Sequence, residues 1–203
     1  MDNVKRLIEQ RQMTTSEERV VQQLDAEQLK EGLPEILRSP ADQGTVELIV
    51  RRPAVDERER LEEAELDLER GLVGDDWYAR GSKSMSDGSS NPDAQLTLAN
   101  ARAVDLVAAG DRERWALAGD QFYVDFDISE ANLPAGSRLS LGTAVIEVSA
   151  LPHDGCVKYS ARFGKDAHRF VNSKENRHLN LRGINAKVVE PGTVRRGDAI
   201  RKL

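Results

Sequence analysis

Hydrophobic and polar residues alternate along two stretches of the chain, which is the pattern of strands that bury one face. In residues 44–51 the side chains of Val46, Leu48 and Val50 share one face, and a proline soon afterwards ends the run. In residues 122–128 every second residue is again apolar, beginning with a phenylalanine. We therefore predict two strands that each bury a single face.

Short apolar runs separated by turn residues continue this pattern toward the end of the chain. They predict further strands at 139–141, 145–148, 186–189 and 199–203. Between the last two runs, Pro191 and Gly192 occupy the second and third positions of a four-residue turn, which predicts a type II turn. Many short strands that do not alternate with helices indicate a mainly β fold, either a barrel or a sandwich.

Helical signals dominate the first 40 residues. A capping-box pattern at 15–18 predicts one helix start, and Asp25 with Gln28 repeats the pattern further along. Gly32 and Pro34 then predict the end of this second helix. The segment is too short and too polar to bury a core of its own, so we expect it to be an extension of a larger domain.

One helix is predicted among the strands, over residues 101–109. Asn100 is a favourable N-cap residue for it, and Gly110 is a favourable residue at its C-terminal end. We divide the chain into a helical N-terminal extension, residues 1–43, and a β-barrel domain, residues 44–203. The predicted fold class is mainly β, with a few short helices.

Composition and net charge exclude several classes of protein. The chain has a net charge of −6 and no run of about 18 apolar residues, so we expect neither a membrane span nor wholesale nucleic-acid binding. The N-terminus lacks the apolar stretch of a secretory signal. A single cysteine cannot form an internal disulfide, so we expect a protein of the reducing cytoplasm.

The charge is unevenly distributed along the chain. Residues 153–203 carry 12 basic and 5 acidic side chains, whereas the residues before them are acidic overall. The same segment holds all three histidines and the single cysteine. This cationic segment predicts a local site for an anionic ligand, and the alternative is a positive surface without a specific partner.

The candidate reactive group of this segment is the thiol of Cys156. Pro152 and Gly155 predict a compact turn that holds it at the end of a strand, between His153 and Lys158. Nearby cations favour the thiolate form, which acts as a nucleophile, a persulfide carrier or a ligand of a soft metal. The alternative is a buried, inert cysteine with His153 as a hydrogen-bonding partner in the turn. The spacing of the histidines matches no zinc site.

Two other stretches carry groups that suit an anionic or polar ligand. Residues 169–178 offer guanidinium, amide and hydroxyl donors, and the alternative is a solvated loop. Residues 81–93 are rich in Gly, Ser, Asn and Asp, which predicts an exposed loop. Arg80 and Lys83, at the start of this loop, are predicted to close over an anion. No glycine-rich phosphate loop follows a strand, so a nucleotide site is not expected.

A turn between two glycines precedes this loop. Gly71 and Gly74 mark a strained turn, and Asp75 follows directly. Its carboxylate is predicted to bind backbone N–H groups, with contact to a ligand as the alternative.

The order of several short motifs resembles that of a known family. The motifs are IVRRP at 49–53, ELD at 65–67, GLVGD at 71–75, LPAG at 133–136, LG at 141–142, AVIEV at 144–148, CVK at 156–158, GINAKVVEPG at 183–192 and RGD at 196–198. Together they resemble a MOSC domain, the module named for the C-terminal part of molybdenum cofactor sulfurases. The likeness covers residues 44–203. Family members often have proline immediately before the cysteine, where this chain has Gly155, which suggests a distinct branch.

The resemblance implies a twisted β-barrel with a pocket for the molybdenum cofactor, a molybdenum–molybdopterin, or for an intermediate of it. Cys156 would ligate the metal or carry sulfur, and His153 and Lys158 would tune the thiol. The remaining predicted cofactor-binding residues, which would hold the anionic end, are Arg169, Asn172, Arg177 and Arg182, with Arg80 and Lys83 in the loop. The desulfurase domain of the larger sulfurases is not part of this sequence, so no Schiff-base lysine is predicted.

Three functions stay open, of which the resemblance implies the first two. The first is reduction of N-hydroxylated compounds at molybdenum, with a redox partner as the electron donor. The second is a non-redox persulfide carrier, loaded by a cysteine desulfurase. The third is a non-catalytic binding module in which the thiol is structural and the acidic helical N-terminus recruits a partner.

Overall fold

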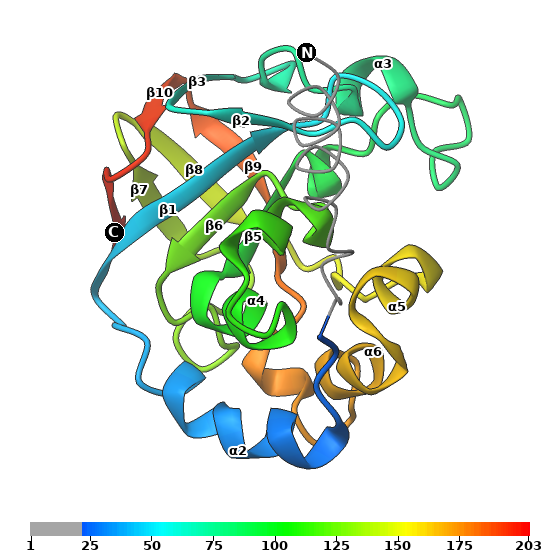
Figure 1. The fold of residues 1–203 in the computed structure, drawn as a ribbon. Coiled ribbons are helices and arrows are strands. Elements are labelled where there is room, and N and C mark those ends of the chain that lie inside the picture. Colours follow the sequence, from blue (N-terminus) through cyan, green and yellow to red (C-terminus); the bar gives the residue numbers. More distant parts are fainter. Residues whose placement is uncertain (1–21) are drawn as a thin grey trace, which may run out of the picture.

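A closed β-barrel forms the centre of the computed structural model, which describes residues 22–203 (Figure 1). Within these residues, seven strands pair around the barrel in the order β1, β11, β7, β8, β9, β5, β6, and β6 pairs again with β1. The strands are β1 (Gln43–Arg51), β5 (Leu96–Asn100), β6 (Phe122–Asp125), β7 (Arg138–Leu141), β8 (Ala144–Val148), β9 (Ile184–Glu190) and β11 (Ala199–Lys202). The predicted β-barrel is confirmed, and the sandwich alternative is excluded.

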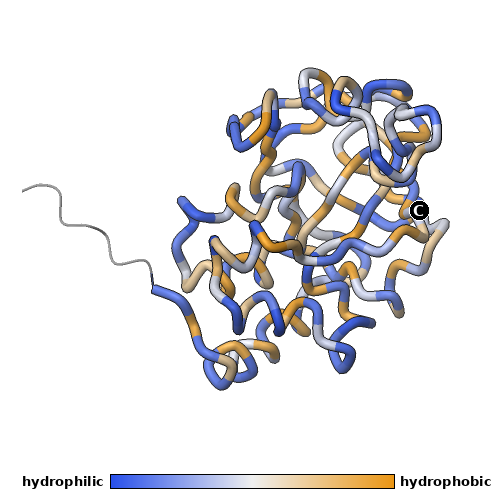
Figure 2. Tube along the Cα trace, turned by 90° about the vertical axis from the view of Figure 1, so that its right-hand side faces the viewer, coloured by the Kyte–Doolittle hydropathy of each residue, from blue (hydrophilic) through white to orange (hydrophobic). Residues whose placement is uncertain are grey.

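Two hydrophobic clusters lie on the two faces of the barrel wall. The inner cluster is built from barrel strands, with Phe122, Val124 and Ile146 among its fully buried side chains. The outer cluster joins the wall to the helices, and Tyr123 belongs to it. In Figure 2 hydrophobic stretches follow the crossing strands, and hydrophilic stretches occupy most of the outer loops. Both faces of this wall are therefore apolar.

The prediction of a single buried face is wrong for β6, whose Phe122 and Tyr123 belong to the inner and outer clusters, and it is wrong for β1. Val46 and Ile49 belong to the inner cluster, whereas Val50 belongs to the outer cluster. The pairing of β1 with β6 shifts its register between Val46 and Leu48. A bulge of this kind inserts one residue and reverses the facing of those that follow it. The helices cover the outer face, so the strict alternation of a half-exposed strand is lost.

Most barrel strands pair antiparallel, but β5 and β6 are parallel, with Leu98 opposite Phe122. Parallel neighbours need a crossover connection. Here the connection holds α4 (Ala101–Val107) and the 3-10 helix η2 (Arg112–Ala118). The helix predicted over 101–109 is confirmed as α4, and the side chain of Asn100 accepts hydrogen bonds from the first turn of this helix.

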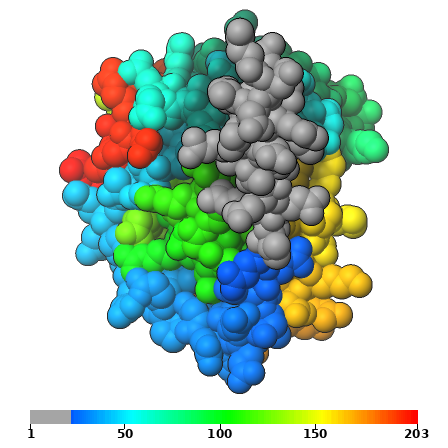
Figure 3. All heavy atoms as spheres, viewed as in Figure 1, coloured from blue at the N-terminus to red at the C-terminus, as the bar shows by residue number. Residues whose placement is uncertain are grey.

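The described residues form six further helical segments. These are α2 (Ala26–Ile36), α3 (Trp77–Arg80), α5 (Val157–Phe163), α6 (Lys165–Val171), η1 (Pro92–Ala94) and η3 (Arg177–Leu179). Helix α2 contacts α4 and α6 at the bottom of the view in Figure 1 and forms the lower part of the surface in Figure 3. None of the described helices combines the length and apolar character that a membrane crossing needs.

The start of α2 was predicted correctly, but its end was not. The Asp25 side chain accepts hydrogen bonds from the first turn, and Gln28 completes the capping box. The helix continues past Gly32 and contains Pro34. A Cβ atom on Gly32 would lie 2.3 Å from Leu106 Cδ1, so this glycine allows α4 to pack closely rather than ending the helix. The capping box predicted at 15–18 lies outside the described residues. The boundary at residue 43 stays a prediction.

A smaller sheet lies at the edge of the barrel, and its strand β10 (Gly192–Arg195) begins where a type II turn was predicted at Pro191 and Gly192. This sheet pairs β3 (Glu63–Asp67) with β10 and β4 (Gly71–Leu72), while β2 (Glu59–Leu61) extends the barrel sheet beside β1. Gly192 starts β10 and does not have the positive φ that a type II turn requires. A Cβ atom there would lie 2.6 Å from the Ala144 backbone nitrogen. Close approach of two strands explains this glycine.

Candidate functional site

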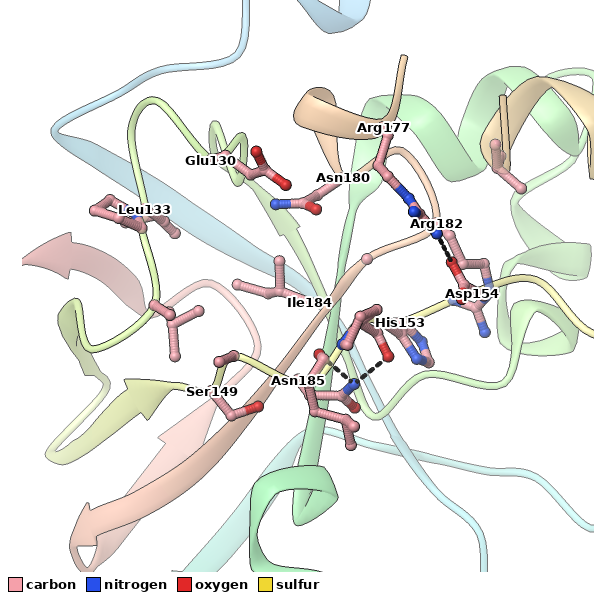
Figure 4. Close-up of a pocket in the computed structure, with 18 of the residues that line it drawn as sticks. Glu130, Leu133, Ser149, His153, Asp154, Arg177, Asn180, Arg182, Ile184 and Asn185 are labelled. Atoms are coloured by element: carbon pink, nitrogen blue, oxygen red, sulfur yellow. Dashed lines mark hydrogen bonds and ion pairs between the residues drawn. The ribbon is translucent and has the colours of Figure 1, made fainter. Parts of the chain in front are cut away.

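A cavity of about 570 Å³ opens where the segment after β8 passes the start of β9 (Figure 4). Arg177, Arg182, Asp154 and His153 lie on the right of the view, whereas Leu133 and Glu130 lie on the left. Its polar lining side chains are Glu130, Ser149, His153, Asp154, Asn172, Arg177, Asn180, Arg182 and Asn185. A mixed lining of apolar wall and a few converging polar groups is typical of a small-molecule site.

Asp120, His153 and Arg182 form a buried charge network beside the cavity. Asp120 is fully buried, and its Oδ1 lies 2.8 Å from His153 Nε2. Arg182 donates from Nη1 to both carboxylate oxygens, at 2.9 and 2.7 Å. Its Nη2 donates to the carbonyl oxygen of Ala118 at 2.9 Å. Residues far apart in sequence are thus held in one arrangement.

Burial and pairing set the charges of this network. Burial alone would raise the pKa of Asp120, but the charge of Arg182 and the hydrogen bonds from His153 and Arg182 lower it to about 2. Burial and the charge of Arg182 lower the pKa of His153, against the opposing effect of Asp120. At neutral pH the network therefore holds an ionised aspartate, a neutral histidine and a cationic arginine.

Arg182 keeps one nitrogen without a partner. Its Nε atom is buried and makes no hydrogen bond, although the side chain lines the cavity. The guanidinium carbon lies 5.0 Å from the centre of the Tyr159 ring, which supports the group from one face. A buried donor without a partner costs free energy, so the hydrogen-bonding capacity of this atom is left unsatisfied in the structure.

The turn before Cys156 is held by side chains of α6. Asn172 accepts a hydrogen bond from the Gly155 N–H at 2.8 Å and donates to the Gly155 carbonyl at 3.2 Å. His168 Nε2 lies 2.9 Å from the same carbonyl oxygen. Cys156 follows as the N-cap residue of α5 and is exposed. The alternative of a buried cysteine is therefore excluded.

The hydrogen bonds to Gly155 also show how far the thiol lies from the cavity along the chain. Asp154 and Asn172 both line the cavity, and Asn172 holds the one residue that separates Asp154 from Cys156. Two residues span at most about 7.6 Å between Cα atoms. Cys156 therefore lies two residues along the chain from the cavity-lining Asp154 and does not line the cavity itself.

Four of the nine predicted site residues line this cavity. They are His153, Asn172, Arg177 and Arg182. Arg177 is exposed, and its Nη2 lies 3.6 Å from Asp154 Oδ1, toward which it points in Figure 4. His153 hydrogen-bonds to Asp120 rather than within the cysteine turn.

The other predicted cations lie outside the cavity lining. Lys158 donates to Asp56, Arg169 pairs with Asp166 on its own helix, and Arg80 pairs with Asp76. Lys83 is exposed in the loop after α3. These residues are spread over separate parts of the surface, and their roles stay predictions.

The turn between the two glycines behaves as predicted. The buried Asp75 carboxylate accepts hydrogen bonds from the backbone N–H groups of Arg52 and Trp77. It also forms a two-point pair with the Arg52 guanidinium, whose third contact is the Gly119 carbonyl at 3.1 Å. The turn therefore braces the segment that carries Asp120.

Sequence reasoning missed Asp120, and no local signal marks it. The residue precedes a strand in an ordinary turn, 33 positions from His153 and 62 from Arg182. Asn180 and Asn185 were also missed. The left-handed backbone at Asn180 is a conformation that asparagine tolerates well, but asparagine alone is too common to indicate a site. Within the described residues, no cluster of three or more His, Cys, Asp or Glu side chains is placed to hold a metal ion.

Comparison with known proteins identifies the family. The family model described as MOSC domain matches residues 86–201, more than half of the chain. The chain belongs to the MOSC domain family. This family is linked to molybdenum cofactor binding or sulfuration. The matched region contains the cavity and Cys156, while β1, which closes the MOSC barrel, precedes it.

Solved structures share the MOSC fold. The YuaD protein of Bacillus subtilis is similar with a TM-score of 0.59 and 17% identity, over 78% of this chain and 94% of that one. YiiM of Escherichia coli is similar with a TM-score of 0.50 and 19% identity, over 78% of this chain and 69% of that one. A search of curated protein sequences gives no match. At these identities the structural likeness establishes the fold alone.

Proposed function

We propose that this MOSC protein binds the molybdenum cofactor, or a molybdopterin intermediate, with Cys156 as its thiolate ligand and the anionic end of the ligand in the cavity. The observation that supports this most is the set of hydrogen bonds between Gly155 and the side chains of Asn172 and His168. These bonds hold the turn that precedes the exposed thiol of Cys156. A rigid turn reduces the entropy that the thiol would lose on binding.

The donor set fits such a ligand. A thiolate is a soft ligand of the kind that molybdenum–sulfur chemistry needs, and a single thiolate is sufficient when the cofactor supplies its own sulfur atoms. The cavity contributes two guanidinium groups, Arg177 and Arg182, and amides at Asn172 and Asn180. Guanidinium groups bind phosphate strongly. The volume of about 570 Å³ lies within the usual range for ligand sites.

Different residues of this chain would hold the anionic end of the ligand and the thiol. Arg177, which is exposed, would donate hydrogen bonds to the anionic end and Arg182 would contribute its positive charge, while Asn172 and His168 would keep the thiol in place. When bound, the cofactor supplies two-electron redox chemistry of the kind that reduces N-hydroxylated compounds. That reduction consumes two electrons and two protons and releases water, so it needs an external redox partner as the electron donor.

Metal and pterin content of the purified protein tests the proposal. The protein is produced in a host that makes the cofactor, and molybdenum is measured by mass spectrometry and pterin by fluorescence after oxidation. We expect stoichiometric molybdenum in the wild type and in Lys174→Ala, an exposed control, and at least a tenfold loss in Cys156→Ser. Equal molybdenum in the wild type and Cys156→Ser would remove the role of the thiol. Neither molybdenum nor pterin in the wild type would overturn the proposal.

A second candidate function is a persulfide carrier, and the exposure of Cys156 favours it as well. Here the thiol would accept one sulfur atom from a cysteine desulfurase and pass it on without a metal. Intact mass after incubation with a desulfurase and free cysteine would show the gain of one sulfur atom, absent in Cys156→Ser. If native Cys156 resists both persulfidation and alkylation, the non-catalytic binding module is the better description.

A further inference from the structure

Asp120 is a buried charged group that the proposed cofactor site does not use. It is fully buried, and it contacts the cavity only through the side chains of His153 and Arg182. A buried carboxylate is costly to maintain, and replacing such a pair by apolar residues often stabilises a protein. A carboxylate kept in contact with a cavity-lining histidine therefore suggests a role for that histidine.

The hydrogen bond between the two residues determines where the imidazole proton lies. Asp120 is ionised and accepts hydrogen bonds only, so Nε2 of the neutral His153 must carry the ring proton and donate it. The other ring nitrogen, Nδ1, then has a free lone pair. Arg182, which neutralises Asp120 through two hydrogen bonds, keeps the carboxylate ionised.

Nδ1 of His153 has no hydrogen-bond partner among residues 22–203. The histidine lines the cavity, and its position there depends on Gly183, because a Cβ atom on this glycine would lie 2.9 Å from His153 Cδ2. Asparagine amides and arginine guanidinium groups supply donors elsewhere in the lining. His153 adds an acceptor, which selects for a ligand that carries an N–H or O–H group.

We propose that Asp120 is a positioning residue that fixes His153 in the Nε2–H tautomer, and that the cavity ligand presents an N–H or O–H group to His153 Nδ1. The ligand class is a polar heterocycle with ring or amino N–H groups. The assignment of the tautomer rests on the hydrogen bond between His153 and Asp120. The choice of a pterin as the probe below rests on the proposed function.

Histidine side-chain NMR on the 15N-labelled full chain, free of cofactor and at neutral pH, tests the tautomer. His153→Phe assigns the signals of His153. We expect a protonated Nε2 and an unprotonated Nδ1 in the wild type. In Asp120→Asn the amide can donate to Nε2 and reverse the pattern, while His168, bound to the Gly155 carbonyl, stays unchanged. A protonated Nδ1 in the wild type overturns the proposal, even if Asp120→Asn fails to fold.

Binding of neopterin, which carries ring and amino N–H groups, tests the ligand class. We expect the His153 Nδ1 signal to shift as neopterin saturates the wild type, and His153→Phe to weaken affinity about tenfold, the value of one hydrogen bond. His178→Phe, at an exposed histidine, is the control. An unmoved Nδ1 signal, or equal affinity of His153→Phe and the wild type, overturns the assignment of the ligand. Molybdenum retention depends on Cys156 and is measured separately, so the two proposals can fail independently.

Discussion

Two aspartates of this protein each hold two cationic or basic side chains, but one is buried and the other exposed. Asp120 pairs with His153 and Arg182 and is fully buried. Asp56 pairs with Lys158 and Arg162 on α5, and its side chain is 56% exposed. The two clusters have similar short distances, so distance alone does not distinguish them.

The environment separates their effects. For Asp120, the charge of Arg182 and the hydrogen bonds from His153 and Arg182 outweigh the cost of burial and lower the pKa to about 2. For Asp56, the hydrogen bond from Lys158 is the main cause of a lowered pKa, and water screens the pair. A buried aspartate can therefore fix the geometry of a site. An exposed aspartate leaves its neighbours free to rearrange.

The largest effect is expected when the buried cluster is broken. Asp120→Ala leaves Arg182 as an uncompensated buried charge, so the free energy of unfolding should fall by about 3–5 kcal/mol. Urea unfolding followed by circular dichroism measures this. The comparison requires the free energy of unfolding to fall much less in Asp56→Asn, which keeps a residue suited to the left-handed backbone at position 56. If the two variants lose equal stability, burial does not decide the strength of these pairs.

His153 should make the stability of the protein depend on pH between pH 7 and 5. Its pKa is lowered in the folded protein, so below about 6.5 the unfolded chain takes up a proton that the folded chain does not. Stability therefore falls as the pH is lowered through this window, by up to ~1.4 kcal/mol per pH unit. Urea unfolding between pH 7 and 5 should show a steeper loss in the wild type than in His153→Phe. Parallel curves would contradict the neutral, buried state of His153.

A third prediction concerns the turn before Cys156, which Asn172 holds through Gly155. Asn172→Ala removes both side-chain hydrogen bonds to Gly155 and should cost about 1–2 kcal/mol. We also expect faster amide exchange at residues 154–157, measured by mass spectrometry, because local opening becomes easier. Asn176→Ala, whose side chain makes no capping bond, is the matched control. Unchanged exchange in Asn172→Ala would mean that α5 alone positions Cys156.

The smallest effect belongs to the exposed cluster. Asp56→Asn removes the charge at a position whose backbone is left-handed (φ 64°), a conformation that asparagine tolerates, so the unfolding midpoint should stay nearly unchanged and added salt should remove whatever difference remains. Differential scanning calorimetry at low and high salt checks this. A large loss that persists in high salt would show that the exposed pairs with Lys158 and Arg162 determine the position of α5.

The secondary structure was predictable where the signals are local. Asn100 caps α4, and Asp25 with Gln28 starts α2. Asp75, which follows the glycine turn, binds backbone N–H groups as predicted. Predictions failed where packing between distant segments decides the outcome. Gly32 is needed for Leu106 to approach, and Gly192 for its strand to lie close to Ala144. A glycine chosen for close approach and a glycine chosen for a turn look alike in a sequence.

The candidate site was predictable in part for the same reason. Cys156, His153 and Asn172 lie within one cationic stretch, so composition pointed to them together. Asp120 was not found, because its partners come from segments 33 and 62 residues away. Nor did the sequence show that only some of its basic residues would line the cavity, since exposed arginines such as Arg169 pair with neighbours on their own helix.

The sequence by itself determined the alternation of apolar residues, the helix starts, the family motifs and the single thiol, because each depends on residues that are neighbours along the chain. Only the tertiary structure decided which strand faces are buried, which cations meet, and that one carboxylate is enclosed with a histidine and an arginine. Closing the barrel brings β9 and the segment after β8 against the turn before β6, and exclusion of water there gives Asp120 its influence.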